Sequence, residues 1–505
     1  MKDYLKQGIR GSMFVLAASI GANVLGYFTR MFLARNLSLE DFGLFYSLLT
    51  FFMFIQLFAD FGYGLTLAKY VPDFLARKKK RLSDSSFFHV FMIKMVLSLC
   101  FAAVLYLFSD WLALEYFGIR IVKRMIVLFI MILFANNILE FIFQVYISLQ
   151  DMFKYSINYL ASKALFLIFI IAFFDAGFNA DALLPTYAYL MSLCLVLAGT
   201  VIPMYVSINP SRILFSFDRI LFRRLTRFAF PTMLSSMGGM IIGYIDVIIL
   251  TFFVTLDQVG IYNTVLPTIL MIGYLNGAIV TVFLPMVSEM WAKKDVAKIR
   301  KGLSLIYKYS ILFTVPCSIL SFFYADVILD LLFGPEYIAG ALAMKILSFG
   351  VCLLGLSLVN FSVLSGIGRP EKVTVINLTT AGINAVLNIL LIPFYGIEGA
   401  ALTTTLSYLI MFLWSYNSVK NYLNFKIYPN FVLKLFGISI IFAILILFCR
   451  SFGQNKVYTI IGLFVSCIIF IISLIITKTV KLQEITFFLS SFLSGFWKYF
   501  AFLLK

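Results

Sequence analysis

The stretch that decides the fold is GYFTRMFLARNLSLEDFGLFY, from Gly26 to Tyr46, because a second copy of it occurs later in the chain. The second copy, GYIDVIILTFFVTLDQVGIYN, runs from Gly243 to Asn263. Each copy is an apolar segment, a short acidic turn and another apolar segment. Five identities fall in register, all 217 residues apart: Gly26 with Gly243, Tyr27 with Tyr244, Leu33 with Leu250, Leu39 with Leu256, and Gly43 with Gly260. General likeness between membrane hairpins explains this register less well than two homologous lobes, from which many transporters are built.

Composition places the chain in a membrane. Hydrophobic residues make up 62% and charged residues 12% of the 505 positions, far from the balance of a soluble domain. The net charge of +17 comes from Lys and Arg in short loops between apolar segments, which indicates membrane orientation and not nucleic-acid binding. The six cysteines lie in or at the ends of apolar segments without CxxC spacing, so we interpret them as small core residues. The basic, then apolar, N-terminus lacks a small-residue cleavage site, and we expect it to be the first span.

Apolar runs long enough to cross the bilayer predict an all-α polytopic protein with fourteen transmembrane helices. The first twelve are expected at roughly 12–34, 42–67, 87–109, 121–147, 155–176, 183–207, 229–251, 258–287, 303–324, 338–366, 371–393 and 398–418. Two further spans are expected at about 431–449 and 457–477. The predicted domains are a six-helix N-terminal lobe (1–210), a six-helix C-terminal lobe (211–424), two additional helices (425–480) and a tail (481–505).

Positive charge collects in alternate loops and so predicts the orientation of the chain. Lys69 and the run Arg77–Arg81 occupy the second loop, whereas the loop around Asp175–Asp181 has no Lys or Arg. Both termini are therefore expected in the cytoplasm. Six spans in each lobe make the lobes parallel repeats, related by an axis along the membrane normal. Apolar residues at helical spacing in 485–504 predict an amphipathic helix on the cytoplasmic face; a fifteenth span is the alternative.

Polar groups inside predicted spans are costly to bury and are candidates for function by default. The candidates are Arg30, Asp60, Lys94, Asn136, Glu140, Lys163, Asp246, Lys345, Asn377 and Asn384. Asn136, Glu140 and Gln144 are spaced for one helix face. A Lys94–Glu140 or Lys163–Glu140 ion pair that only joins helices is an equal alternative for the charged residues. Interhelical hydrogen bonding explains the asparagines as well as substrate contact does.

Features typical of an enzyme are missing from the sequence. No predicted loop is long enough for a separate catalytic domain, and His89 is the single histidine. A histidine metal site is thereby excluded, and a Ser-His-Asp triad is not expected. The sequence contains no Walker motif, so direct ATP use is not expected either. We therefore predict neither enzyme activity nor a metal site.

Several motifs together resemble a known transporter family. They are residues 33–45 (LARNLSLEDFGLF), 60–62 (DFG), 68–69 (AK), 228–231 (FAFP), 332–337 (LFGPEY), 365–369 (SGIGR) and 392–401 (IPFYGIEGAA). Their order and spacing are similar to the oligosaccharide flippases of the polysaccharide transporter family, within the multidrug/oligosaccharidyl-lipid/polysaccharide flippase superfamily. The resemblance covers nearly the whole chain.

The resemblance implies two six-helix lobes around a central cavity, two extra helices, and alternating access. The implied activity is flipping of a polyprenyl-diphosphate-linked oligosaccharide from the cytoplasmic to the outer leaflet of the cell membrane, for surface polysaccharide or glycan assembly. Candidate contacts to the diphosphate and sugars are Arg30, Lys94, Lys163, Lys345, Asn136, Asn377 and Asn384. Candidate ion-coupling residues are Asp60, Glu140 and Asp246.

No cofactor is expected. Coupling to H⁺ or Na⁺ is expected because outward movement of a charged head group without an ATPase requires another energy source. We also expect a monomer in the lipid bilayer, with glycan polymerases or transferases as partners and no nucleic acid. A multidrug or organic-cation antiporter of the same superfamily is the alternative, although intramembrane lysines suit cationic drugs poorly. The scattered lysines also differ from the arginine cluster of the peptidoglycan lipid flippases. A membrane glycosyltransferase or polymer ligase is a third class, and a large outward loop with paired acids would have favoured it.

Overall fold

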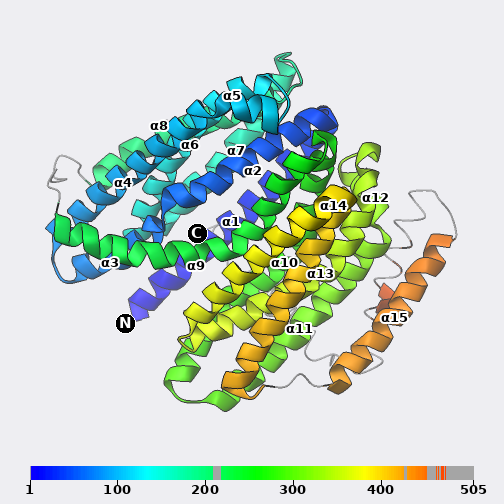
Figure 1. Ribbon diagram of the computed structural model, residues 1–505. Coiled ribbons are helices and arrows are strands. Elements are labelled where there is room, and N and C mark those ends of the chain that lie inside the picture. Colours follow the sequence, from blue (N-terminus) through cyan, green and yellow to red (C-terminus); the bar gives the residue numbers. More distant parts are fainter. Residues whose placement is uncertain are drawn as a thin grey trace, which may run out of the picture. The chain divides into compact units, whose positions relative to one another are not determined.

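The structure is a computed structural model that describes residues 2–208, 218–425 and 429–451, with separate positions between 462 and 473. Every regular element in these ranges is helical, so the predicted all-α class is confirmed (Figure 1). The first part contains α1 (Lys2–Asn36), α2 (Leu39–Asp60), α3 (Tyr63–Ala76), α4 (Lys80–Leu107), α5 (Ser109–Trp111), a π-helical turn (Leu112–Tyr116), α6 (Ile121–Ser148), α7 (Met152–Asp175) and α8 (Leu183–Ile208). It is followed by α9 (Arg219–Phe253), α10 (Leu256–Ala292), α11 (Val296–Phe323), α12 (Ala325–Leu332), a 3₁₀ turn (Pro335–Gly340), α13 (Ala341–Gly366), α14 (Pro370–Leu423) and α15 (Pro429–Ser451).

Helix boundaries follow local capping chemistry. Ser38 precedes α2 and accepts a hydrogen bond from the Asp41 main-chain N–H, and Asp151 does the same for Lys154 at the start of α7. Asp218 accepts from two main-chain N–H groups of α9, and Asp295 caps α11. These side chains satisfy N–H groups that a helix start leaves without a partner. Short polar residues between apolar runs therefore end one span and begin the next.

The predicted span 42–67 is wrong as a single helix. The chain breaks at Phe61 and Gly62, which both have positive φ, and continues as α3 to Ala76. A Cβ on Gly62 would lie 2.4 Å from the Ala229 carbonyl oxygen. Glycine at this position therefore allows both the left-handed backbone conformation and the close approach of α9.

The predicted spans 371–393 and 398–418 fall within α14, which contains a non-helical residue at Gly396 (φ 52°) that separates two helices. The last predicted span, 457–477, is described only at isolated positions. The predicted tail helix lies outside the described residues.

Helix α4 exposes apolar side chains and buries polar ones, as expected for a helix with one side in lipid. In α4, Val96, Leu99 and Leu107 are exposed while Lys94 and Ser98 are buried. Within the residues that were described, nine helical stretches are long and apolar enough to cross a membrane. The chain is a multi-pass membrane protein. The count of fourteen spans and the lobe repeat stay predictions.

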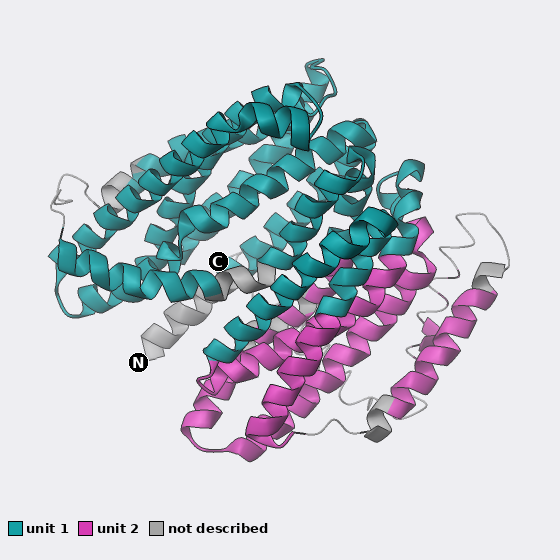
Figure 2. Cartoon of the chain, viewed as in Figure 1, with its two compact units in different colours: residues 1–268, 329–343, 370–407 teal, residues 269–328, 344–369, 408–505 magenta. Residues whose placement is uncertain are grey.

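The chain forms two compact units (Figure 2). The first comprises residues 1–268, 329–343 and 370–407, and the second comprises 269–328, 344–369 and 408–505. In the first unit, α3, α4, α6 and α9 share a core that includes Leu67, Val90, Val145 and Leu225. In the second, α11 packs against α15 around Leu435 and Phe442. The predicted lobe boundaries remain a prediction.

Candidate functional site

A buried ion pair joins α2 to α4 in the first unit. The Lys94 ammonium lies 2.8 Å from Asp60 Oδ1; the Lys94 side chain is fully buried, and the Asp60 side chain is 34% exposed. A buried cation needs a partner because it has lost its water. Asp60 therefore compensates much of the charge of Lys94. The alternative in which Lys94 pairs with Glu140 is wrong, since the partner comes from α2.

A chain of hydrogen bonds extends this ion pair to α6. Gln56 donates to Asn137 Oδ1 (2.5 Å), Asn137 donates to Ser98 Oγ (2.6 Å), and Ser98 donates to the Lys94 carbonyl (2.7 Å). Asn136 was a predicted site residue, whereas its neighbour Asn137, which forms these bonds, was not. Gln56 lies one helical turn before Asp60, and Ser98 lies one turn after Lys94, so a same-face search around each charge would have found both.

Glu140 and Lys163 extend the charged region into α7. The charges that act on Glu140 are those of Lys94, Asp60 and Lys163, and Glu140 is the charge that acts on Lys163. Neither residue forms a direct ion pair with any described side chain, so the alternative of a Lys163–Glu140 bridge is wrong as well. Both side chains are half-buried. Lys163 is thus a cation within the membrane region without a carboxylate in contact.

Arg30 is held by polar and aromatic groups instead of by an acid. Its guanidinium lies 4.2 Å from the centre of the Tyr46 ring and donates to the Asn263 main-chain carbonyl. Among the described residues, Arg30 has no ion-pair partner. Tyr27, one turn earlier, hydrogen-bonds Thr268 (2.9 Å). This surrounding fixes the guanidinium without neutralising it.

Contacts between α1 and α7 place Arg30 and Lys163 at different depths. Phe14 contacts Phe153, Gly21 faces Leu160, and Phe32 contacts Phe174. The two helices therefore run in the same direction, and Lys163 is level with position 24 of α1. Arg30 lies six residues further along, roughly 9 Å at 1.5 Å per residue. These two cations, neither of which has a carboxylate in contact, are spaced along one helix pair.

A second polar network surrounds Asp246, which is fully buried. Its oxygens accept hydrogen bonds from Tyr262 (2.9 Å), from Asn388 (2.7 Å) and from Thr404. Asn388 also donates to Asn384 Oδ1 (3.1 Å). The network joins α9, α10 and α14 and leaves the carboxylate well satisfied. Asp246 and Asn384 were predicted as site residues, whereas Asn388, Tyr262 and Thr404 were not.

The other predicted site residues are separate from these networks. Asn377 is 6% exposed, and its Oδ1 is a buried acceptor without a hydrogen-bond partner among the described atoms. Asn136 is half-buried and belongs to neither network. Lys345 belongs to the second unit, whereas the other candidates belong to the first. The roles of all of these residues stay predictions.

The repeated glycines of the opening motif contact each other. A Cβ on Gly43 would lie 1.9 Å from the Leu256 carbonyl oxygen, and one on Gly260 would lie 2.8 Å from the Leu39 carbonyl oxygen. The contact is reciprocal, because Leu39 and Leu256 are also equivalent positions of the repeat. This is the pattern expected of two copies related by a twofold axis, and the repeat of whole lobes stays a prediction.

The sequence is similar to a known protein family and to several proteins. The family model described as "Polysaccharide biosynthesis protein" matches residues 9–291. The uncharacterized membrane protein MJ1068 of Methanocaldococcus jannaschii is 29% identical over 425 residues, which are 82% of this chain and 84% of that protein. The probable low-salt glycan biosynthesis flippase Agl15 of Haloferax volcanii is 25% identical over 236 residues, 47% of this chain and 48% of that one.

The fold is similar to a solved structure. The lipid II flippase MurJ in an inward closed conformation superposes with a TM-score of 0.74 at 17% identity, covering 91% of this chain and 98% of that one. At this identity the likeness concerns the fold alone.

Proposed function

Because the chain belongs to the polysaccharide biosynthesis protein family, we propose that it is a flippase for a polyprenyl-diphosphate-linked oligosaccharide. The substrate moves from the cytoplasmic to the outer leaflet of the cell membrane by alternating access. The chain works as a monomer with both termini in the cytoplasm and supplies glycan polymerases or transferases. No catalytic step is part of this function.

The observation that carries the proposal is a pair of cations without a carboxylate in contact, Arg30 and Lys163, on adjacent helices of the membrane region. A cation without a carboxylate in contact is expensive to bury, and it is retained where a ligand supplies the negative charge. Arg binds phosphate as a fork and Lys as a point charge. Their spacing along α1 and α7 suits a diphosphate that passes from one to the other. Lys94 is a weaker candidate because Asp60 neutralises it.

The saccharide needs hydrogen-bonding groups that a hydrocarbon interior lacks. Tyr27 and Tyr46 lie beside Arg30, and Asn377 offers a buried oxygen without a partner. Hydroxyl and amide groups of this kind pair with sugar hydroxyls. Asn136, Asn384 and Lys345 remain further candidates for contact along the path.

A gradient of H⁺ or Na⁺ drives transport in this proposal, because the sequence has no ATP-binding motif. Asp246 is the favoured coupling residue. Its carboxylate, the amide oxygens of Asn384 and Asn388 and the Thr404 hydroxyl form a buried set of oxygens. Oxygen sets of this kind suit a hard cation or a proton. Asp60 and Glu140 are the second choices.

Equilibrium binding to the purified protein tests the substrate class. A fluorescent polyprenyl-diphosphate oligosaccharide is titrated into wild type, Arg30→Gln and Lys163→Gln. Each substitution removes one charge-assisted hydrogen bond, about 1.5–3 kcal/mol, so the affinity should fall roughly ten- to a hundredfold. Lys123→Gln, an exposed cation paired with Asp110, is the matched control. Binding of an organic cation in place of the diphosphate lipid, unaffected by either substitution, would support the antiporter alternative.

A further inference from the structure

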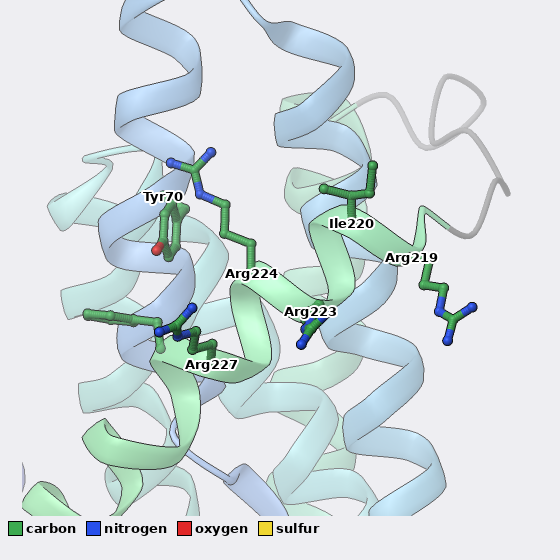
Figure 3. A pocket seen from close by; sticks show the side chains of 7 residues that line it. Tyr70, Arg219, Ile220, Arg223, Arg224 and Arg227 are labelled. Atoms are coloured by element: carbon green, nitrogen blue, oxygen red, sulfur yellow. The ribbon is translucent and has the colours of Figure 1, made fainter.

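A second cationic site lies apart from the membrane charges. A pocket of about 590 Å³ is lined by α3 and the first turns of α9 (Figure 3). Its lining residues are Tyr70, Arg219, Ile220, Arg223, Arg224, Arg227 and Phe228. Four guanidinium groups thus border one small volume. The proposed transport path uses none of them.

The amphipathic start of α9 explains why the arginines gather there. Leu221, Leu225 and Ala229 are buried in the core shared with α3, α4 and α6. Arg223, Arg224 and Arg227 follow a helical stripe on the other side and are exposed. Figure 3 shows Arg224 and Arg227 on the side of α9 near Tyr70, with Arg219 directed away from that ring. The helix buries its apolar face and presents arginine to the pocket.

The charge of the pocket is not neutralised by nearby acids. Within the described ranges, none of the four arginines forms an ion pair with a carboxylate. The carboxylate of Asp218 accepts from the main-chain N–H groups of Ile220 and Leu221. Asp73 on α3 pairs with Arg77 at 2.8 Å. The adjacent acids are thus already engaged by other groups.

Aromatic rings hold the cations in place. The Arg224 guanidinium lies 5.0 Å from the centre of the Tyr70 ring and 5.6 Å from that of Phe74. The Lys69 ammonium lies 3.7 Å from the centre of the Phe228 ring. Stacking on a ring orients a planar guanidinium and leaves its N–H groups available. The pocket is therefore prepared for an anion.

The position of the pocket along α9 indicates the type of anion. One turn beyond the arginines Phe230 is exposed, and Leu65 is exposed one turn before Lys69 on α3. Along both helices, exposed charged residues thus lie one turn from exposed apolar residues. The same change occurs at the boundary between lipid head groups and acyl chains. A ligand bound at this depth has an anionic head and an apolar tail.

We propose that this pocket binds the phosphate head group of an anionic membrane lipid. Two sources have this chemistry: a resident phospholipid, or a polyprenyl diphosphate before it enters the transport path. Arginine forks bind the phosphate oxygens, and the tail lies along the apolar surface next to Phe230. The site does not depend on the proposed transport and can be tested without it.

The alternative explanation for the arginine cluster is a role in membrane insertion alone, because basic residues fix the orientation of a membrane protein through their charge. For that role lysine serves as well as arginine, and the basic segments 77–81 and 293–301 contain both. The start of α9 uses arginine at all four pocket positions. A triple variant, Arg223→Lys, Arg224→Lys and Arg227→Lys, keeps the charge and removes the forks, so it separates the two explanations.

The experiment measures lipid retention by native mass spectrometry of the full-length protein. The probes are phosphatidylglycerol, polyprenyl diphosphate and net-neutral phosphatidylcholine, with inorganic pyrophosphate as a soluble competitor. The matched control combines Lys294→Ala, in the turn between α10 and α11, with Lys301→Ala, in the first turns of α11; both side chains are exposed. Thermal unfolding of each variant checks its folding.

The proposal predicts that the wild type and the control retain an anionic lipid at least tenfold better than phosphatidylcholine. The lysine triple variant should lose most of this preference while unfolding at the same temperature. Stronger retention of polyprenyl diphosphate than of phosphatidylglycerol identifies the transport substrate as the ligand, and equal retention identifies a resident lipid. Undiminished retention in the lysine variant, or no preference over phosphatidylcholine in the wild type, would overturn the proposal. If the triple variant does not fold, failure of pyrophosphate to displace the lipid from the wild type overturns it.

Discussion

At the scale of single residues, the intramembrane cations differ in how they are compensated. Lys94 has Asp60 at 2.8 Å, whereas Arg30 has a ring and a carbonyl, and Lys163 has no carboxylate in contact. Under the proposed function, this difference decides which cations are available to an anionic substrate. It also predicts that their substitutions act on different properties, namely stability for Lys94 and substrate binding for the other two.

Lys94→Met should destabilise the protein because it leaves Asp60 without its partner. Removing one member of a buried pair costs about 3–5 kcal/mol, with the lower end expected here since Asp60 is partly exposed. The double variant Lys94→Met with Asp60→Leu should recover most of the loss. Thermal unfolding in detergent measures both. A double variant as unstable as the single one would show that the pair does not account for the effect.

Asp246→Asn should uncouple transport from the ion gradient. The substitution keeps the shape of the side chain but removes the charge that Tyr262, Asn388 and Thr404 surround. We expect substrate movement in proteoliposomes to become independent of an imposed H⁺ or Na⁺ gradient. Asp257→Asn, at an exposed acid in the first turn of α10, is the control that should leave the gradient dependence intact. Gradient dependence that persists in Asp246→Asn would remove this residue from the coupling role.

The sequence was enough to locate the charged members of both networks but not their partners. Charges stand out in apolar spans because of their cost. Gln56, Ser98, Asn137 and Thr404 are ordinary residues of membrane helices, and only packing makes them partners. Asn136 and Asn137 differ by about 100° around the helix axis. The sequence does not fix which face of the helix points inward to better than this angle, so Asn136 was predicted in place of Asn137.

At the scale of elements, span boundaries were predictable and breaks within spans were not. The prediction of 121–147 corresponds to α6 (Ile121–Ser148), because charges and short polar residues end each apolar run. The break at Phe61 and Gly62 lies inside an apolar run. Its cause is the approach of α9, a contact distant in the sequence.

Gly43→Ala should destabilise the contact between α2 and α10. The added methyl group would meet the Leu256 carbonyl 1.9 Å away, which forces the helices apart at a cost of about 1–3 kcal/mol. Gly26→Ala is the matched control from the same motif, because nothing lies within 4 Å of its added Cβ. It should be neutral or stabilise by up to about 1 kcal/mol through helix propensity. Equal unfolding temperatures for the two variants would contradict the close contact.

At the scale of the whole molecule, alternation of basic turns predicts which loops face the cytoplasm. In a variant without the six native cysteines, Lys79→Cys should react with an impermeant maleimide only after the membrane is permeabilised. Asn179→Cys, in the turn between α7 and α8, should react in intact cells. Both positions are exposed in the structure. The reverse pattern of labelling would invert the predicted orientation and the direction of flipping.

The central claim is that the whole molecule moves a lipid-linked saccharide across the bilayer, and leaflet translocation tests it most directly. A fluorescent polyprenyl-diphosphate oligosaccharide is incorporated into proteoliposomes, and the fraction accessible to a membrane-impermeant quencher is followed with time. The account predicts protein-dependent translocation that Arg30→Gln and Lys163→Gln each slow at least tenfold, while Lys123→Gln does not. Translocation no faster than in protein-free liposomes, with transport of an organic cation in its place, would contradict the account.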